Sequence, residues 1–351
     1  MAIDLPPLID LNTTHSRVGS SPTDLTEVGG FVYFTAATSS TGSELWKTDG
    51  TVAGTVIVKP INATSGNTSG SNSVTIGNTV FFVTDDGVNG SELWKTDGTL
   101  NGTSLVKAIA PPGDFSATPG NLTALGNKLL FTAGDGVNGR ELWVSDGTDA
   151  GTFLLSNITP GTGSTFDSNA SRDSLATAGG FAYFFTKPAT SYEDLWRSDG
   201  TVAGTTLVKD FTPSSFRTRL TGVGNRVFFT DSTPSTGPEI WTSDGTDAGT
   251  TLVKDINPGI YGAEPTQLAN VNGTLIFDVQ LAEIWRSDGT EAGTIMVADM
   301  QLGLTEANPR EFTVADSLVF FTANSGDNRE LWALPLALFL PHKNYLPLVS
   351  S

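Results

Sequence analysis

The chain has 351 residues and carries 37 Asp and Glu against 19 Lys and Arg, which gives a formal net charge of −18. This charge disfavours binding to nucleic acid and to anionic membrane surfaces. Cysteine is absent and the only histidines are His15 and His342, which excludes a disulfide framework, a thiolate metal site and a zinc site of three histidines.

The N-terminal residues Met1 to Asp4 lack the basic start and the apolar stretch of a signal peptide. If the native protein is exported, we expect its signal peptide to have been replaced in this chain. The longest apolar run, residues 331–340, is too short to cross a bilayer and contains Pro335. We therefore expect no insertion into a membrane.

A repeated phrase organises the chain from residue 20 onward. Each tryptophan follows an acidic residue and then Leu or Ile, and the spacings between tryptophans, by subtraction, are 48, 49, 53, 45, 44 and 47 residues. After the first six tryptophans comes a second phrase, [S/T]-D-G-T-x-x-G-T. The seven tryptophans are Trp46, Trp94, Trp143, Trp196, Trp241, Trp285 and Trp332.

Each repeat is predicted to form four strands. In the third repeat these strands are 121–125, 128–133, 141–145 and 152–158. Gly126-Asn127 is a two-residue hairpin turn between the first two strands, and an Asp-Gly-Thr turn joins the last two. A period of about 40 to 50 residues with several short strands is typical of propeller blades.

The sequence therefore predicts an all-β fold, a seven-bladed β-propeller of four-stranded antiparallel blades over residues 8–334. The seventh repeat ends after Glu330-Leu331-Trp332 and lacks both the Asp-Gly-Thr turn and a fourth strand. Residues 8–12 resemble the fourth strands of other repeats, so we expect this N-terminal strand to complete the last blade and close the ring. Residues 335–351 are predicted to be a Pro- and Leu-rich tail. The repeat units are about 20–61, 72–109, 119–158, 173–211, 219–256, 265–300 and 309–334 plus 8–12.

These phrases resemble the family of bacterial repeat proteins named for E-L-W-x-x-D-G-T, over residues 20–334. The terminal segment 343–349 resembles a tail found on some exported bacterial proteins. The resemblance implies a repeat architecture that is extracellular or attached to the cell surface, and it implies no established chemistry.

The recurring residues are interpreted as structural. A tryptophan in every repeat could serve as a platform for sugar rings, but packing between blades explains it better. If the last hairpin of a blade pairs Thr48 with Thr55, Glu44 falls opposite Lys59, and we expect such cross-strand ion pairs in four blades. The other three expected pairs are Glu92 with Lys107, Asp194 with Lys209 and Glu239 with Lys254. The Asp-Gly-Thr acids are interpreted as organisers of their turns.

The variable loops that connect blades are the predicted binding region, because function on a repetitive scaffold resides in the parts that differ. These loops are 60–73, 110–120, 157–173, 211–219, 257–265 and 300–309. The candidate ligand-binding residues are Phe115, Phe166, Tyr192, Phe216, Arg217, Arg219 and Tyr261. Their aromatic rings could stack on sugars or hold a protein, or they could instead pack over the ends of the blades.

Two acidic loops suggest a structural Ca²⁺ site, because carboxylate and carbonyl oxygens are calcium ligands. The candidate ligands are Asp85, Asp86, Asn89, Asp135 and Asn138. The alternative is that these residues only form the turns. No other cofactor is expected.

We therefore expect a non-enzymatic, exported binding or scaffold module that holds a protein or carbohydrate ligand on its loop rim. The alternative is a carbohydrate-binding lectin with repeated sites between blades. A hydrolase is disfavoured, because no compact asymmetric set of titratable groups is apparent and none of the residues is assigned a catalytic role.

Overall fold

A computed structural model describes most of the chain, in two compact units. The described residues are 11, 19–38, 42–61, 73–111, 117–159, 161, 163–166, 175–186, 194–211, 218–300, 307–325 and 328–340, without the side chains of 42, 43, 218 and 219. The first unit comprises Met1–Asp173 and Gly200–Thr205, and the second comprises Ser174–Asp199 and Thr206–Ser351.

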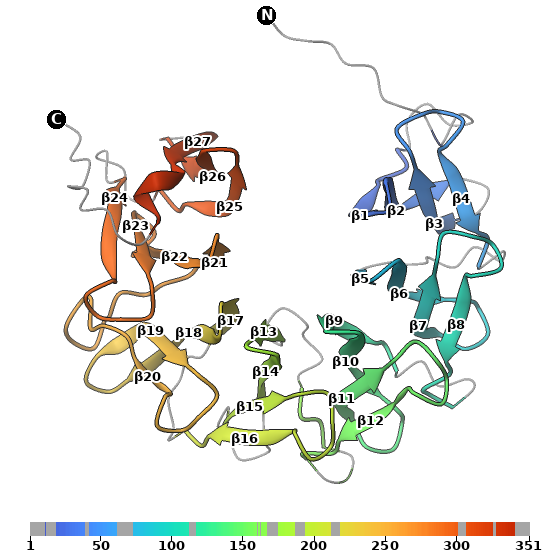
Figure 1. The fold of residues 1–351 in the computed structure, drawn as a ribbon, viewed down its shortest axis with the longest axis horizontal. Helices are drawn as coiled ribbons and strands as arrows, with labels where there is room; N and C mark the ends of the chain where they lie inside the picture. Colours follow the sequence, from blue (N-terminus) through green and yellow to red (C-terminus); the bar gives the residue numbers. More distant parts are fainter. Residues whose placement is uncertain are drawn as a thin grey trace, which may run out of the picture. The chain divides into compact units, whose positions relative to one another are not determined.

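The first unit contains three antiparallel sheets of four strands, each formed by consecutive strands of one repeat (Figure 1). Its strands are β1 (Thr23–Val28), β2 (Phe31–Thr38), β3 (Gly42–Thr48), β4 (Val56–Lys59), β5 (Val74–Ile76), β6 (Thr79–Asp85), β7 (Ser91–Thr96), β8 (Ser104–Lys107), β9 (Gly120–Leu125), β10 (Lys128–Gly134), β11 (Arg140–Ser145) and β12 (Phe153–Ser156).

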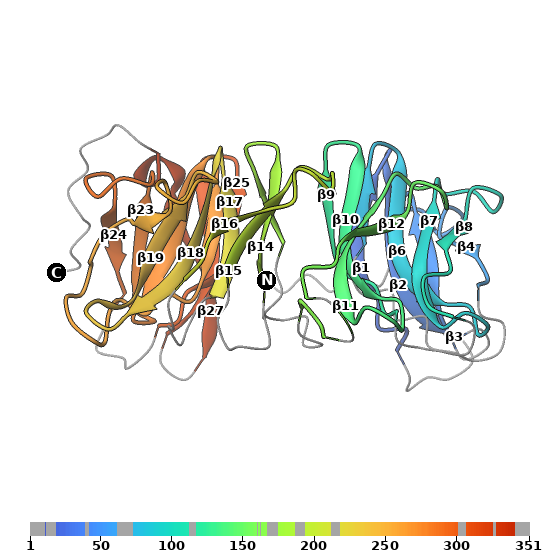
Figure 2. The ribbon, with the colours of Figure 1, turned by 90° about the horizontal axis from the view of Figure 1, so that it is seen from below.

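The second unit contains three further four-stranded sheets and one sheet in which the described residues form three strands. Its strands are β13 (Ala176–Ala178), β14 (Phe181–Thr186), β15 (Asp194–Ser198), β16 (Thr206–Lys209), β17 (Thr218–Val223), β18 (Arg226–Thr233), β19 (Gly237–Ser243), β20 (Thr251–Leu252), β21 (Leu268–Val271), β22 (Thr274–Val279), β23 (Glu283–Ser287), β24 (Ile295–Asp299), β25 (Arg310–Ala315), β26 (Leu318–Asn324) and β27 (Arg329–Pro335). In Figure 2 neighbouring strands such as β17, β18 and β19 run side by side.

The predicted fold class is confirmed: the chain is all-β, with seven antiparallel sheets in chain order, as a seven-bladed β-propeller requires. The turns form as their residues predict. Gly126 has a φ of +60°, which glycine adopts without steric cost, and Leu125 pairs with Lys128 across this turn. No helix in the described ranges is long and apolar enough to cross a membrane.

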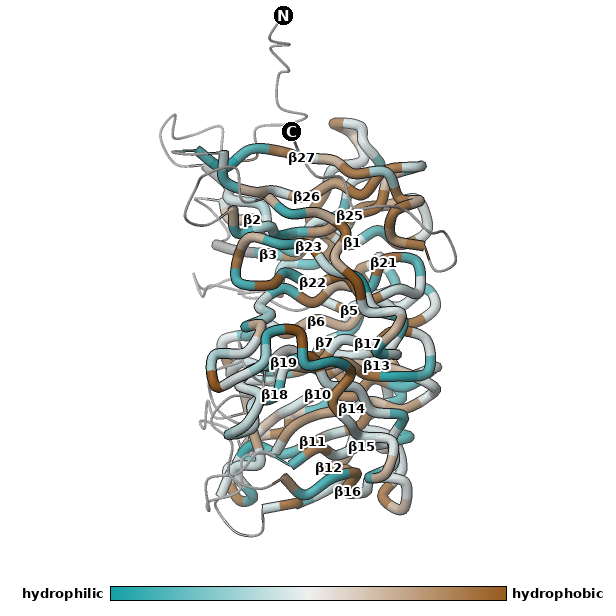
Figure 3. The backbone as a smooth tube through the Cα atoms, turned by 90° about the vertical axis from the view of Figure 1, so that its left-hand side faces the viewer, coloured by the Kyte–Doolittle hydropathy of each residue, from teal (hydrophilic) through white to brown (hydrophobic). Residues whose placement is uncertain are grey.

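The hydrophobic core lies between neighbouring sheets of a unit, and the E-L-W phrase builds it. Leu93 of β7 shares a cluster with Trp143 of β11 in the next sheet. Leu45 shares one with Trp94 in the same way. Because side chains alternate along a strand, the leucine of one blade and the tryptophan of the next can meet between the sheets. Hydrophobic and polar positions are accordingly interspersed along the strands (Figure 3).

The predicted ion pairs between the motif acids and the lysines of the fourth strand are wrong. A bulge shifts the register of β3 and β4, so Lys59 lies opposite Leu45 instead of Glu44. The Lys59 ammonium donates to the carbonyl of Thr103 in the next sheet, at 2.8 Å. The same register shift pairs Leu93 with Lys107. The acids and lysines therefore lie on opposite faces, and each lysine reaches a neighbouring blade.

The last sheet differs from the other six. Leu331 of β27 is 70 % exposed, whereas the equivalent Leu or Ile in every other sheet is at most 6 % exposed. The predicted fourth strand, residues 8–12, lies outside the described residues apart from Leu11, which packs against Phe34, Ala36 and Trp46.

The segment after β27 occupies the place of the missing Asp-Gly-Thr turn. A 3₁₀ helix, Leu336–Leu338, follows the strand, and Phe339 is fully buried in the cluster that also contains Phe321. Arg286 Nη1 donates to the carbonyl of Leu340 at 2.6 Å. Lys47 follows its motif tryptophan as Arg286 does. In the first unit, Lys47 Nζ donates to the carbonyl of Gly98, in an Asp-Gly-Thr turn, at 2.7 Å. The predicted tail thus packs on the last sheet as far as residue 340, and residues 341–351 lie outside the described part.

Candidate functional site

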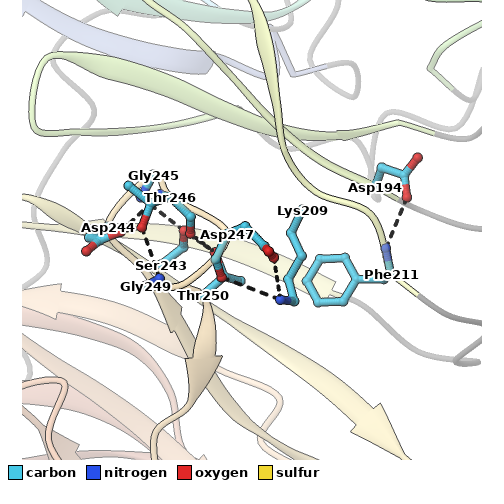
Figure 4. Close-up of polar contacts among 10 residues, drawn as sticks. All are labelled: Asp194, Lys209, Phe211, Ser243, Asp244, Gly245, Thr246, Asp247, Gly249 and Thr250. Atoms are coloured by element: carbon cyan, nitrogen blue, oxygen red, sulfur yellow. Dashed lines mark hydrogen bonds and ion pairs between the residues drawn. The ribbon is translucent and has the colours of Figure 1, made fainter.

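Hydrogen bonds within each Asp-Gly-Thr turn hold its shape, as Figure 4 shows for the turn at Asp244. Asp244 Oδ1 accepts from the Thr246 amide at 3.0 Å and from its hydroxyl at 2.7 Å, which lowers the pKa of Asp244. Thr246 Oγ1 in turn accepts from the Gly249 amide at 3.0 Å. The hydroxyls of Ser243 and Thr250 bond across the hairpin at 2.7 Å. The same carboxylate contacts recur in the turns at Asp49, Asp97, Asp146 and Asp288.

These turns also connect neighbouring blades. Lys209 Nζ lies 2.7 Å from Asp247 Oδ1 and 5.9 Å from the centre of the Phe211 ring (Figure 4). In the first unit Lys107 Nζ lies 3.0 Å from Asp149 Oδ1. The turns are thus engaged in holding sheets together, which supports the structural interpretation of the Asp-Gly-Thr acids.

The acids of the E-L-W phrase are interior groups. Glu92 and Glu239 are fully buried, and burial raises the pKa of each to about 7. Glu92 Oε1 accepts from the amide of Ala110, at 3.0 Å, and Glu239 Oε1 accepts from the amide of Asn257 at the same distance. Each acid therefore links the third strand of its sheet, by a hydrogen bond, to the residues that follow the fourth strand. Equivalent bonds join Ile61 to Glu44, Ile158 to Glu141 and Phe211 to Asp194.

The candidate calcium ligands form Asx turns. Asp86 Oδ1 accepts from the amides of Val88 and Asn89 at 2.9 and 2.7 Å, while Oδ2 accepts from the Asn89 side chain at 2.8 Å. Asp135 and Asn138 repeat this arrangement, and Asp85 Oδ1 accepts from the amide of Gly87. These bonds show the turn-forming role. Among the described residues, no three acidic or histidine side chains gather as metal ligands, and the Ca²⁺ site stays a prediction.

The predicted ligand-binding residues separate into three groups. Phe166 is only 2 % exposed, so its ring belongs to the interior and is not offered to a ligand. Arg219 lies in β17, but its side chain is outside the described set. Phe115, Tyr192, Phe216 and Arg217 also lie outside the described residues. Tyr261 is 75 % exposed and stands beside Ile260, which is 68 % exposed.

The loop that carries Tyr261 is held at both ends. Of the six predicted binding loops, only 257–265 is described in full. Asn257 Nδ2 donates to the carbonyl of Gly262 at 2.9 Å, and Ala263 donates from its amide to Pro238 at 2.9 Å. A Cβ atom at Gly237 would lie only 2.5 Å from the Gly262 nitrogen, so the loop is in close contact with the start of β19. Ile260 and Tyr261 therefore project from an anchored loop.

A strained turn adjoins this loop and was missed by the sequence reasoning. Gln280 and Leu281 join β22 to β23 with φ values of +50° and +57°, a left-handed conformation that is unusual for a leucine. The Gln280 amide donates to the carbonyl of Ala263 at 3.0 Å, and Leu281 accepts from the amide of Asn308 at 2.5 Å. Such strain is often stored at functional sites. In the sequence, only the short spacing between Phe277 and Trp285 indicates that this turn is short.

We define the Tyr261 surface as Ile260, Tyr261, Glu264 and Gln280, all of which are exposed. It combines an aromatic ring, an aliphatic side chain, a carboxylate and an amide. Such a set can stack on a planar or apolar ligand and accept hydrogen bonds from it.

The comparisons with known proteins show the fold alone. No protein-family model and no curated protein sequence matches the chain. Among solved structures, the chain is similar to a prolyl endopeptidase at 12 % identity and a TM-score of 0.56, over 90 % of this chain and 48 % of the peptidase. Prolyl oligopeptidase B from Galerina marginata gives 11 % identity and 0.56, over 90 % and 49 %. A puromycin-hydrolysing peptidase from Mycobacterium tuberculosis gives 11 % and 0.52, over 90 % and 52 %. The chain spans about half the length of these enzymes.

Proposed function

We propose that the protein is a non-enzymatic binding module, exported to the cell surface or medium, that holds a protein or carbohydrate ligand on the Tyr261 surface. The observation that carries this proposal is the 75 % exposure of Tyr261 on a loop whose ends are hydrogen-bonded to its own sheet. An aromatic ring held in advance loses little conformational entropy when it binds. The family resemblance, which implies extracellular repeat proteins, supports the location.

The non-enzymatic assignment rests on where the perturbed acids lie. Four described carboxyls have a raised pKa, and all four are fully buried: Glu92, Glu141, Glu239 and Asp278. Asp278 accepts from the Thr266 hydroxyl and from the amides of Thr266 and Gln267. A substrate cannot reach acids that are enclosed by their own backbone, so their raised pKa values indicate burial and not acid–base catalysis.

A carbohydrate ligand is the second form of this proposal, because a sugar ring stacks on an exposed tyrosine. A glycan array probed with wild-type protein and with Tyr261→Ala separates the two forms. Sugar-dependent signal that Tyr261→Ala abolishes would identify a lectin, and a blank array would rule the lectin out.

A protein ligand is tested by a photo-crosslinking amino acid at position 261, with native extracellular fractions as the source of ligand. Position 88 is the matched control, because Val88 is 73 % exposed on a different loop. We expect one defined adduct from position 261 and none from position 88. A blank array together with equal crosslinking from both positions would overturn the binding role of this surface.

A further inference from the structure

The motif tryptophans differ from sheet to sheet in what their indole N–H groups contact. In three sheets Nε1 donates to a backbone carbonyl of the second strand: Trp46 to Ala36 at 3.2 Å, Trp143 to Ala133 at 3.2 Å, and Trp332 to Ala323 at 3.3 Å. The acceptor residue is alanine in each case. Each of these alanines also pairs across the strands with the motif acid.

Three sheets have a polar residue in place of this alanine. In the β14–β15 pair it is Thr186, opposite Asp194. Thr84 lies opposite Glu92 in the β6–β7 pair, and Asp231 lies opposite Glu239 in the β18–β19 pair. In the second and fifth sheets the indole Nε1 of Trp94 and of Trp241 has no hydrogen-bond partner among the described residues.

Other buried atoms in the same two sheets also lack partners. Oε2 of Glu92, Oε2 of Glu239 and Oγ1 of Thr84 accept and donate no hydrogen bond within the described chain, although each is inaccessible to solvent. Unpaired buried polar atoms are rare because their desolvation is uncompensated.

In the β5–β8 sheet Thr75 Oγ1 of β5 is also unpaired, and the atoms of Thr84, Glu92 and Trp94 lie together on one face. Thr84 is directly opposite Glu92, and Trp94 follows Glu92 by two residues, so all three side chains leave the same side of the sheet. Together they offer a carboxylate acceptor, an indole donor and a hydroxyl. One water molecule can bond to all three, and buried water has about three such partners. A cation is disfavoured, because the indole N–H points the positive end of its dipole at the site.

Two other sheets satisfy the same groups with protein atoms. The hydroxyl of Thr165 donates to the carboxylate of Glu141, 2.7 and 2.6 Å from its two oxygens. This hydroxyl is the donor that a water molecule would otherwise provide. In the sixth sheet Trp285 Nε1 donates directly to Glu283 Oε2 at 2.7 Å. The acid and the indole are therefore within bridging reach of each other.

We propose that a buried water molecule accepts from Trp94 Nε1 and donates to Glu92 Oε2 and Thr84 Oγ1, and that a second one bridges Glu239 Oε2 and Trp241 Nε1. Polar groups that face each other beyond direct contact are commonly joined in this way. The water sites are internal parts of two blades, and they are independent of the proposed ligand on the Tyr261 surface.

A crystal structure of the full chain at a resolution that shows ordered solvent tests the proposal. We expect one density peak about 3 Å from Glu92 Oε2 and Trp94 Nε1, and another at Glu239 and Trp241. No such peak is expected beside the Nε1 atoms of Trp46 or Trp143. Direct contact between the indole and the carboxylate, or contacts as short as about 2.4 Å that identify a metal ion, would overturn it.

The Thr84→Ala variant supplies the matched comparison. We expect the indole of Trp94 to bond to the carbonyl of residue 84, as Trp46 does to Ala36, and the first water to disappear while the second remains. In solution, the indole N–H signals of Trp94 and Trp241 should show magnetisation transfer from a bound water, and those of Trp46 and Trp143 should not. Trp→Phe variants assign the signals. Equal transfer to all four indoles, or none to Trp94 and Trp241, would refute the bound waters.

Discussion

The ammonium group of Lys209 lies 2.7 Å from Oδ1 of Asp247, on the turn of the next sheet along the chain. This lysine does not pair with Asp194, the acid of its own hairpin, because a bulge places Leu195 opposite Lys209. Asp194 instead accepts a hydrogen bond from the amide of Phe211. A shift of one residue in the strand register thus decides whether the lysine pairs with an acid of its own blade or with the turn of the next blade.

The Lys209–Asp247 pair is expected to contribute little to stability. The two side chains are 24 % and 75 % exposed, so water and salt screen their attraction. We expect Lys209→Met to lower the free energy of unfolding by less than about 1 kcal/mol, and by still less at about 1 M salt. Urea unfolding at low and high salt measures both effects. A salt-independent loss would point to packing of the lysine stem on Phe211 as the cause.

Leu93 and Leu331 occupy the same position of the motif but should respond differently to truncation. Leu93 is fully buried against the next sheet, so Leu93→Ala is expected to cost about 2–5 kcal/mol. Leu331 is 70 % exposed, and Leu331→Ala should cost no more than about 0.5 kcal/mol. Chemical denaturation of the two variants provides the comparison. A large loss from Leu331→Ala would mean that a segment outside the described residues covers this strand.

Position 249 requires glycine, because a Cβ atom on residue 249 would overlap the carboxylate of Asp244. We expect Gly249→Ala to cost about 1–3 kcal/mol, because the carboxylate must leave its hydrogen bonds to Thr246. The cost should be smaller in an Asp244→Ala background, where the obstruction is absent. A double-mutant cycle with a coupling of about 0.5–3 kcal/mol is the expected result. Additive losses would show that the two residues do not interact in this way.

Stability should fall as the pH rises from about 4 to about 7. Burial raises the pKa of Glu92 and Glu239 to about 7, whereas a glutamate in the unfolded chain titrates near about 4.3. Between these values the folded state holds protons that the unfolded state has released, so each rise in pH favours unfolding. The full effect is at most about 4 kcal/mol per group, because one pKa unit corresponds to about 1.4 kcal/mol. Glu92→Gln should flatten the pH dependence, and an unchanged slope would place the titration elsewhere.

Most of the strand pattern could be predicted from local residues. The predicted strands 128–133 and 141–145 differ from β10 and β11 by a single residue at one end. This agreement arises because alternation, hairpin glycines and the repeat period are all local signals. The position of the tryptophans between blades followed from the same alternation, and Trp143 is indeed 6 % exposed.

The candidate site was only partly predictable. Tyr261 was singled out because it is an aromatic residue in a loop that differs between repeats, and it is exposed. Phe166 satisfied the same criterion and is buried, because exposure depends on how a loop folds over its sheet. The left-handed turn at Gln280 and Leu281 carries no glycine or asparagine that would have indicated it.

The sequence by itself determined the repeat, the all-β fold and the seven sheets, since each of these depends on residues close together in the chain. Only the tertiary structure decided what the motif acids and lysines contact. Glu92 faces the end of its own fourth strand, and Lys107 reaches Asp149 of the next blade. The physical reason is the bulge after Leu93, which changes which side chains share a face of the sheet. The spacing of residues in the sequence does not indicate this bulge.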